Sequence, residues 1–339
     1  MTNSKRPVYV ITGFLGSGKT TLLNHLVSHV EMKDTAVIIN EFGEVGIDHM
    51  LVKSSFEDVV LLKNGCLCCT IRGDLLDTLE TLAIREEQGE IPSFSRVVIE
   101  TTGLADPAPI LQTLMIDPII TERYVLNSIV TTIDSVNGLA QLADNPESIK
   151  QVAIADLLLL TKTDLAEPKT IDLITTELAT LNPSAKKLNL LNGVLDPTVI
   201  FDRHDFNPAS KQINIDEWLG KDFAEDHGHA HNVNRHNEEI STFCIRRDTA
   251  LPWPTVKEWL QSIISLRGQD VIRIKAILDL EGFDRPVVLH GVQQALHDPV
   301  LLEAWPTPER ASSIVFIGRN LVHQEIEAAL DKLLVKIAA

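Results

Sequence analysis

The fold is decided by the stretch GFLGSGKT at residues 13–20, which follows directly after the apolar run VYVIT at residues 8–12. Two glycines five positions apart, followed by Lys and Thr, form the pattern of a phosphate-binding loop. Glycine takes backbone angles that other residues avoid, so successive N–H groups can turn inward around a phosphate. In this pattern Lys19 is expected to reach the β- and γ-phosphates, and the Thr20 hydroxyl to bind Mg²⁺. The stretch therefore predicts a nucleoside-triphosphate site.

The helix expected to begin near Lys19 supports this interpretation. Its sequence continues as TTLLNHLV over residues 20–27, and its positive dipole end would point at the bound anion. The alternative, a glycine-rich turn between any strand and helix, is disfavoured because the full motif stands in this context. The residues predicted to contact the nucleotide here are Gly13, Gly16, Ser17, Gly18, Lys19, Thr20 and Thr21.

Length and composition indicate a globular protein of two domains. The chain has 339 residues, of which 44% are hydrophobic and 23% charged, and it is longer than one typical domain. A net charge of −17 argues against binding nucleic acid or an anionic membrane. No run approaches the roughly 20 apolar residues of a membrane helix, and the start of the chain has no signal-peptide core. We therefore expect a cytoplasmic protein.

Strand and helix patterns alternate through about the first 200 residues. Short apolar runs predict strands at 8–12, 35–40, 59–62, 96–100, 128–133 and 155–160, and residues 74–87 show helical spacing. Buried strands separated by helices indicate a mostly parallel sheet that is covered on both faces. We therefore predict an α/β phosphate-loop NTPase domain over residues 1–205, with ligands at the carboxyl ends of the strands.

The chain changes character after about residue 200. Residues 206–238 are rich in Asp, Asn, His and Pro and predict a polar, His-rich linker or loop. Strand patterns follow at 240–246, 271–278, 286–292 and 313–317, with helix patterns at 253–266 and 323–337. Residues 239–339 are therefore predicted to form a smaller α+β domain, with an antiparallel sheet and two helices on one face.

The predicted strand at 96–100 ends in an acid and is followed by a glycine, and both suit nucleotide chemistry. Phosphate-loop proteins place an acid at such a strand end to hold Mg²⁺, and a glycine whose N–H can sense the γ-phosphate. We assign these roles to Glu100 and Gly103. The alternative is a strand that simply ends in a polar turn.

The segment TKTD at residues 161–164 ends another predicted strand and resembles the Asn-Lys-x-Asp guanine motif, with Thr161 in place of Asn. The Asp164 carboxylate can accept hydrogen bonds from N1–H and the 2-amino group of guanine, which adenine does not offer. The Lys162 stem can lie over the base plane. We therefore predict GTP rather than ATP.

Three of the four cysteines, Cys66, Cys68 and Cys69, lie within four positions. So tight a cluster is a poor disulfide framework and indicates a metal or redox site. Thiolates bind Zn²⁺ and similar metals, and an incomplete ligand shell suits a metal that is passed on. A redox pair and inert burial are the alternatives. Cys244 stands alone in an apolar stretch and is predicted to be buried.

A second group of potential metal ligands is the histidine run His227, His229 and His231 in the polar linker. In an extended chain these three side chains point the same way, because side chains alternate with period two. Histidine-rich tracts commonly bind zinc, nickel or copper. The alternative is a solvated loop without a ligand.

Five motifs stand together in order: GFLGSGKTT at 13–21, NEFGE at 40–44, GCLCC at 65–69, ETTGLADP at 100–107 and TKTD at 161–164. With them the chain resembles the CobW-like metallochaperone GTPases, relatives of the hydrogenase and urease maturation GTPases. The resemblance implies GTP-dependent delivery of a metal to a client protein, most often zinc and sometimes cobalt or iron. It also implies that the cysteine motif binds metal near the nucleotide, and that residues 40–48 belong to a switch region.

One hypothesis couples this metal to the nucleotide. GTP and Mg²⁺ would order the switch and cysteine loops, and slow hydrolysis would release them, so that a client can take the metal. The predicted catalytic residues are Lys19, Glu100, Glu41 and Glu44. The predicted Mg²⁺ ligands are Thr20, Glu100 and Asp48. No residue stands out as the one that positions the attacking water.

Three alternatives stay open at this point. The zinc could be purely structural, the protein could be a metal buffer or sensor with secondary GTP turnover, or the loop could serve a small-molecule kinase. Co²⁺ and Ni²⁺ accept the same thiolate and imidazole ligands as Zn²⁺. The client metalloprotein is not identified, and the carboxyl-terminal domain is left for contact with a partner or a second copy of the chain.

Overall fold

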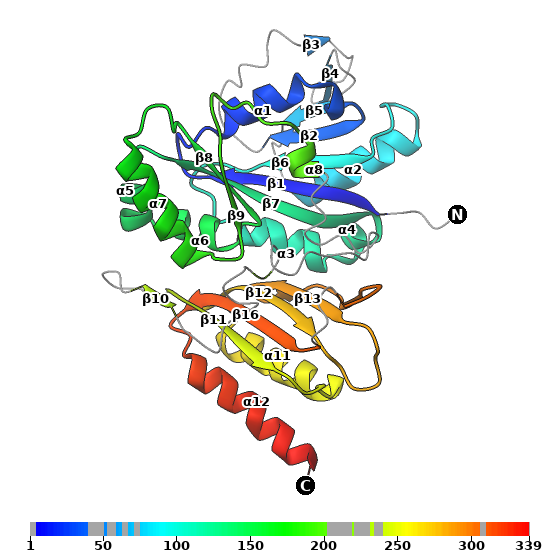
Figure 1. Cartoon of the computed structure of the whole chain (residues 1–339). Helices are drawn as coiled ribbons and strands as arrows, with labels where there is room; N and C mark the ends of the chain where they lie inside the picture. Colours follow the sequence, from blue (N-terminus) through cyan, green and yellow to red (C-terminus); the bar gives the residue numbers. More distant parts are fainter. Residues whose placement is uncertain are drawn as a thin grey trace. The chain divides into compact units, whose positions relative to one another are not determined.

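Two structural units make up the chain in the computed structural model (Figure 1). One consists of Met1–Thr175 with Lys187–Arg203, and the other of Thr176–Lys186 with His204–Ala339. The structure describes residues 5–39, 51–52, 59–62, 67–70, 75–201, 219, 231–233, 240–305 and 310–338, and every element below lies within them. Only the backbone is described for residues 51–52, 59–62, 67–70, 231–233 and 337–338.

One sheet of nine described strands runs through the first unit in the order β3-β4-β5-β2-β6-β1-β7-β8-β9. Its strands are β1 (Arg6–Gly13), β2 (Thr35–Ile39), β3 (Leu51–Val52), β4 (Val59–Leu62), β5 (Leu67–Thr70), β6 (Arg96–Glu100), β7 (Tyr124–Asp134), β8 (Leu157–Thr161) and β9 (Lys186–Asn189). Neighbours from β5 to β8 are parallel, whereas β3–β4 and β4–β5 are antiparallel. The predicted α/β fold with a mostly parallel sheet is confirmed.

Helices cover both faces of this sheet, as Figure 1 shows for α1 on one side and α3 on the other. The elements are α1 (Lys19–Val27), the short helix η1 (Val30–Met32), α2 (Leu75–Glu87), α3 (Ala108–Ile116), α4 (Pro118–Arg123), α5 (Gly138–Asp144), α6 (Pro146–Ala153), α7 (Pro168–Leu181) and α8 (Thr198–Phe201). Tyr9 and Ile11 of β1 pack in one core with Leu22 of α1 and Phe201 of α8. Because β1 is covered on both faces, nearly all of its residues are apolar.

The registers of the parallel strands bring several strand ends to one edge of the sheet. Gly13 at the end of β1 pairs with Thr132 of β7, and Asp134 at the end of β7 pairs with Thr161 of β8. On the other side of β1, Ile11 pairs with Glu100. The phosphate-loop, acidic and guanine motifs therefore begin side by side, at the edge where parallel sheets bind their ligands.

The second unit contains an antiparallel sheet in the order β10-β11-β16-β12-β13-β14, with β15 also paired to β13. Its elements are β10 (His231–Val233), β11 (Ile240–Arg247), α11 (Trp253–Arg267), β12 (Val271–Leu278), β13 (Val287–Val292), β14 (Ala295–Leu296), β15 (Val300–Leu301), β16 (Ser312–Arg319) and α12 (His323–Ala338). The helices α11 and α12 contact each other and share one apolar core with the sheet. This unit matches the expected antiparallel sheet with two helices.

The remaining cysteine, Cys244, lies on β11 and is 6% exposed, as predicted. Burial is the main cause that raises the pKa of its thiol to about 12. Within the part of the chain that the structure describes, no helix has the length and hydropathy needed to cross a membrane.

Several described strands differ from the sequence expectations. The strand expected at 128–133 already begins at Tyr124, and β9 was not expected at all. The sequence of β9 is KKLN and its residues are exposed or half-buried, so hydrophobic periodicity cannot reveal it. Cys68 and Cys69 lie in β5, a strand that was not predicted from the sequence.

The second unit's core predicts a stability effect at Trp259. This side chain is 0% exposed, and its indole Nε1 donates a 3.0 Å hydrogen bond to the carbonyl oxygen of Ile326. We expect Trp259→Ala to lower the free energy of unfolding by about 3–5 kcal/mol, because it leaves a cavity and removes this donor. Urea denaturation measures the change. Leu266→Ala on the same helix is the control, since Leu266 is 82% exposed, and equal losses in both variants would contradict the packing described.

Candidate functional site

The phosphate loop between β1 and α1 contains three glycines with positive φ angles, 140° at Gly13, 71° at Gly16 and 94° at Gly18. Crowding is greatest at Gly13, where a Cβ would lie 2.4 Å from the Oγ1 atom of Thr132 and 2.5 Å from its carbonyl oxygen. The Ser17 hydroxyl also forms a 2.7 Å hydrogen bond with Thr132 Oγ1. The loop therefore lies directly against β7, in an approach that only glycine permits.

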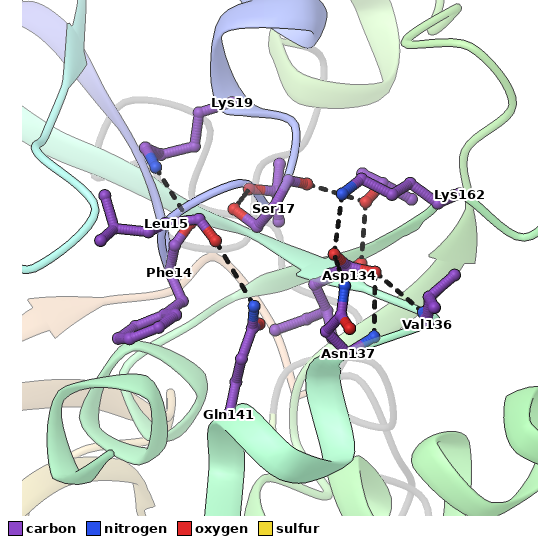
Figure 2. Close-up of polar contacts among 12 residues, drawn as sticks. Phe14, Leu15, Ser17, Lys19, Asp134, Val136, Asn137, Gln141 and Lys162 are labelled. Carbon is purple, nitrogen blue, oxygen red and sulfur yellow. Dashed lines mark hydrogen bonds and ion pairs between the residues drawn. The ribbon is translucent and has the colours of Figure 1, made fainter. Parts of the chain in front are cut away.

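Lys19 places a buried positive charge beside this loop. Its side chain is 5% exposed, and Nζ donates a hydrogen bond to the carbonyl oxygen of Gly13 (2.9 Å). It donates a second one to the carbonyl oxygen of Phe14 (3.2 Å, Figure 2). No acidic residue lies in the first turn of α1, which begins after Gly18. The ammonium group and the helix N-terminus together form a site for an anion.

Two residues expected to share Mg²⁺, Thr20 of α1 and Glu100 of β6, lie within hydrogen-bonding distance of each other. Glu100 ends β6 and is 0% exposed, and its Oε1 accepts a 3.3 Å hydrogen bond from the Thr20 hydroxyl. Hydroxyl and carboxylate oxygens are the hard ligands that Mg²⁺ prefers. The donor set therefore fits a Mg²⁺ ion held beside the phosphate loop. The third predicted ligand, Asp48, lies outside the described residues.

Gly103 lies against the phosphate loop at Leu15. A Cβ on Gly103 would lie 2.8 Å from the backbone nitrogen of Leu15 and 2.9 Å from its Cα. The side-chain amide of Gln151 donates to the carbonyl oxygens of Gly103 (3.3 Å) and Ala105 (3.2 Å). The segment after β6 is thus held close to the phosphate loop. This is the neighbourhood that the role predicted for Gly103, sensing the γ-phosphate, requires.

Thr161, which stands where the guanine motif has Asn, connects the loop to the base side of the site. Its hydroxyl lies 2.7 Å from the carbonyl oxygen of Ser17 and 3.0 Å from that of Ile133, and these two acceptors share its proton. The Ser135 N–H donates in return to the Thr161 carbonyl oxygen (3.0 Å). A threonine hydroxyl therefore fastens the phosphate loop to the ends of β7 and β8.

Lys162 has a carboxylate partner that sequence reasoning missed. Its Nζ lies 2.7 Å from Oδ2 of Asp134, whose side chain is 2% exposed (Figure 2). Burial alone would raise the pKa of Asp134, but hydrogen bonds from Lys162 and Asn137 outweigh it and hold the pKa below its ordinary value. The signal that could have found Asp134 is the one used for Glu100, an acid at the carboxyl end of an apolar strand.

The remaining predicted base contact, Asp164, is exposed, so its carboxylate is open to a ligand. Thr21 is also exposed and faces a loop that sequence reasoning missed. A Cβ on Gly193 would lie 2.9 Å from Thr21 Cγ2, and both Asn192 and Gly193 have positive φ angles, 53° and 75°. The turn after β9 therefore packs against the first turn of α1.

The described backbone locates the cysteine motif, although its side chains are outside the description. Cys69 of β5 pairs with Ile38 of β2, which pairs on its other side with Ile99 of β6. One residue further, Ile39 pairs with both Thr70 and Glu100. Strands in a sheet lie about 4.8 Å apart, so the cysteine strand runs about 10 Å from the strand that carries Glu100.

Several predicted residues lie outside the described ones: Glu41, Glu44, Asp48, Cys66, His227 and His229. For Cys68, Cys69 and His231 only the backbone is described. Among the described side chains, no group of three or more His, Cys, Asp or Glu is placed to hold a metal ion. The metal ligands therefore stay predictions from the sequence.

Two family models match the chain. The one described as "CobW/HypB/UreG, nucleotide-binding domain" matches residues 7–189. The one described as "Cobalamin synthesis protein cobW C-terminal domain" matches residues 240–334. Together they cover both structural units.

Similar proteins span nearly the whole chain. The zinc chaperone YjiA of Escherichia coli is 31% identical over 322 residues, 95% of this chain and 96% of its own length. The zinc-regulated GTPase metalloprotein activator 1 of Schizosaccharomyces pombe is 29% identical over 93% of this chain and 82% of its own length. The crystal structure of Zn(II)-bound YjiA GTPase from E. coli is similar with a TM-score of 0.75 and 28% identity, over 97% of this chain and 99% of that chain.

The loop geometry predicts a difference between two of its glycines. Gly13→Ala should lower the free energy of unfolding by about 3 kcal/mol or more, because its methyl group collides with Thr132 as well as straining the backbone. Gly16→Ala should cost only about 1 kcal/mol of backbone strain, because the space around it is open. Denaturant titration of both variants measures this difference. A loss at Gly16→Ala as large as that at Gly13→Ala would contradict the observed crowding.

Proposed function

This chain belongs to the CobW/HypB/UreG nucleotide-binding family, and on that premise we propose that it hydrolyses GTP and uses the hydrolysis to deliver a transition metal to a client protein. Zinc is the metal of choice, because thiolate and imidazole ligands suit it and because the similar proteins named above are a zinc chaperone and a zinc-regulated activator. Co²⁺ and Ni²⁺ are alternative cargoes with the same ligand preferences.

The nucleotide half of the proposal follows from the loop and its neighbours. Lys19 and the N-terminus of α1 bind the phosphates, while Thr20 and Glu100 hold Mg²⁺ between them. The Mg²⁺ ion would be held by the Thr20 hydroxyl and the Glu100 carboxylate, and it would neutralise negative charge that develops on the phosphates. Gly103 is close enough to the phosphate loop to respond to the γ-phosphate. The exposed Asp164 carboxylate selects guanine over adenine.

The observation that carries the metal half is the register around Ile39. This residue ends β2 and pairs with Thr70, next to Cys69, on one side and with Glu100 on the other. The end of β2 therefore lies between the cysteine strand and the strand that ends in Glu100. A nucleotide-dependent change at this end of β2 would reach both sites, which is the simplest physical route from phosphate to metal.

The remaining site assignments belong to the same proposal. Glu41, Glu44 and Asp48 are the candidates for positioning the attacking water, and Cys66, Cys68 and Cys69 are the proposed metal ligands. The histidine run is proposed as a further metal-binding segment, made of His227, His229 and His231. A client metalloprotein is the expected recipient.

The metal assignment predicts a selective loss in the triple variant Cys66/Cys68/Cys69→Ser. The wild type should bind about one zinc ion per chain at the cysteine motif, and its GTP hydrolysis should respond to free zinc. The triple variant should lose that ion and the response, while Cys244→Ala keeps both, because Cys244 is a lone buried thiol in the second unit. Zinc stoichiometry and phosphate release are measured together at buffered free zinc. Every protein compared, including the one with the natural cysteines, carries His227, His229 and His231 changed to Ala.

Two outcomes would contradict the proposal. Zinc could leave GTP affinity and hydrolysis unchanged in the wild type and the triple variant alike, which would separate metal from nucleotide. Chelation could instead unfold the protein, as expected of a structural zinc, whereas a chaperone should stay folded without metal. Phosphate release without an added acceptor distinguishes the GTPase from a small-molecule kinase.

A further inference from the structure

Asp134 collects four hydrogen bonds at the end of β7. Its Oδ1 accepts from the backbone N–H groups of Val136 (2.8 Å) and Asn137 (3.1 Å). Its Oδ2 accepts from the Asn137 side-chain amide (2.9 Å) and from Lys162 Nζ (2.7 Å). Figure 2 shows these partners converging on one carboxylate. Oδ1 therefore stabilises the turn after β7, while Oδ2 binds the Lys162 ammonium.

The carboxylate is a stable anchor for this lysine. The Asp134 side chain is 2% exposed, while that of Lys162 is 35% exposed, so the anion is fixed and the cation reaches it from the open side. Because the pKa of Asp134 lies below its ordinary value, the carboxylate keeps its charge at neutral pH. Because the Asp134 carboxylate is charged, buried and oriented by its other hydrogen bonds, it restricts the Lys162 ammonium to one position.

The Lys162 backbone is also held, in a conformation that non-glycine residues avoid. Its φ angle is 55°, in the left-handed region. The preceding residue, Thr161, is tied to Ser17 and Ile133 through its hydroxyl, and the Lys162 carbonyl oxygen accepts a 3.0 Å hydrogen bond from Leu165 N–H. Both ends of the Lys162 side chain are therefore fixed, which leaves its four-carbon stem as a preorganised apolar surface.

We propose that Asp134 is the positioning residue for base recognition: it holds the Lys162 ammonium so that the lysine stem forms a fixed platform for the guanine ring beside Asp164. The inference rests on the proposed binding of a guanine nucleotide and deepens it. Fixing the stem before binding removes the entropy cost of ordering a long flexible side chain on the base. Asp134 acts on nucleotide affinity and not on the γ-phosphate chemistry, which belongs to Thr20 and Glu100.

The test compares Asp134→Asn, Lys162→Met and the double variant. Asp134→Asn keeps a carbonyl oxygen that accepts from the Val136 and Asn137 N–H groups. Its amide NH₂ group, however, faces the Lys162 ammonium and repels it. Lys162→Met keeps an unbranched apolar stem and loses the ammonium. Affinity for a fluorescent GDP analogue and the KM and kcat of GTP hydrolysis are measured for each. Asp248→Asn is the control, because it changes a similar Asp partner of a cation, Arg246, in the second unit.

Each single variant should bind GDP about tenfold more weakly and raise KM by a similar factor, the size expected for a lost charge-assisted contact. The kcat should fall less than about twofold, because the transition-state contacts are intact. The double variant should bind GDP about as weakly as the single variant with the lower GDP affinity, and no more weakly, since Asp134 acts through Lys162. The control should bind as the wild type does.

Three results would overturn the inference. Lys162→Met could bind GDP as the wild type does. Because Asp134 is intact in this variant, that result alone would show that the anchored ammonium has no role in binding. The two single effects could multiply to about a hundredfold in the double variant, as for independent sites. A folded Asp134→Asn could show unchanged GDP affinity. By contrast, a wild-type chain that binds no guanine nucleotide would overturn the proposed function itself.

Discussion

The close approach of the phosphate loop to β7 is the constraint on which the site depends. Gly13 has no room for a side chain beside Thr132, and Ser17 is hydrogen-bonded to the same threonine. Thr161 holds the loop from the β8 side by bonding the Ser17 carbonyl oxygen. Because the loop is fixed against two parallel strands, the N-terminus of α1 and Lys19 take fixed positions around the expected phosphates. Anion binding is thereby prepared in the fold, at little ordering cost on binding.

The same sheet explains how one nucleotide could control a metal. Parallel strands run in the same direction, so the ends of strands that are far apart in sequence lie at the same edge of the sheet. Ile39 is the clearest case, because it stands between Thr70 and Glu100. Through Ile39, β2 is paired with the cysteine strand on one side and with the strand that ends in Glu100 on the other. The base side is organised separately, where Asp134 and Lys162 cross-link the ends of β7 and β8. Affinity and coupling are therefore assigned to different strands of one sheet.

The sequence predicted those features that are encoded locally. The glycine spacing defined the phosphate loop, and apolar runs located the central strands and, through their ends, Glu100. It could not predict contacts that depend on which strands pair. Lys162 and Asp134 are 28 positions apart and meet only because β7 and β8 are neighbours. The tie from Thr161 to Ser17 was hidden for the same reason, and β9 because an edge strand of polar residues has no hydrophobic period. The side chains of the cysteine motif are outside the described residues, so its ligand set stays a prediction.

We propose that metal and nucleotide bind to one coupled switch. Coupling of two binding equilibria is reciprocal, so it is visible from either ligand. The most direct measurement is zinc affinity, determined by competition with a chelator of known affinity, in the wild type saturated with GDP and with a non-hydrolysable GTP analogue. We expect the two zinc affinities to differ by at least about fivefold, and zinc to shift the relative affinities of the two nucleotides by the same factor. Equal zinc affinities in the two nucleotide states would contradict the proposal.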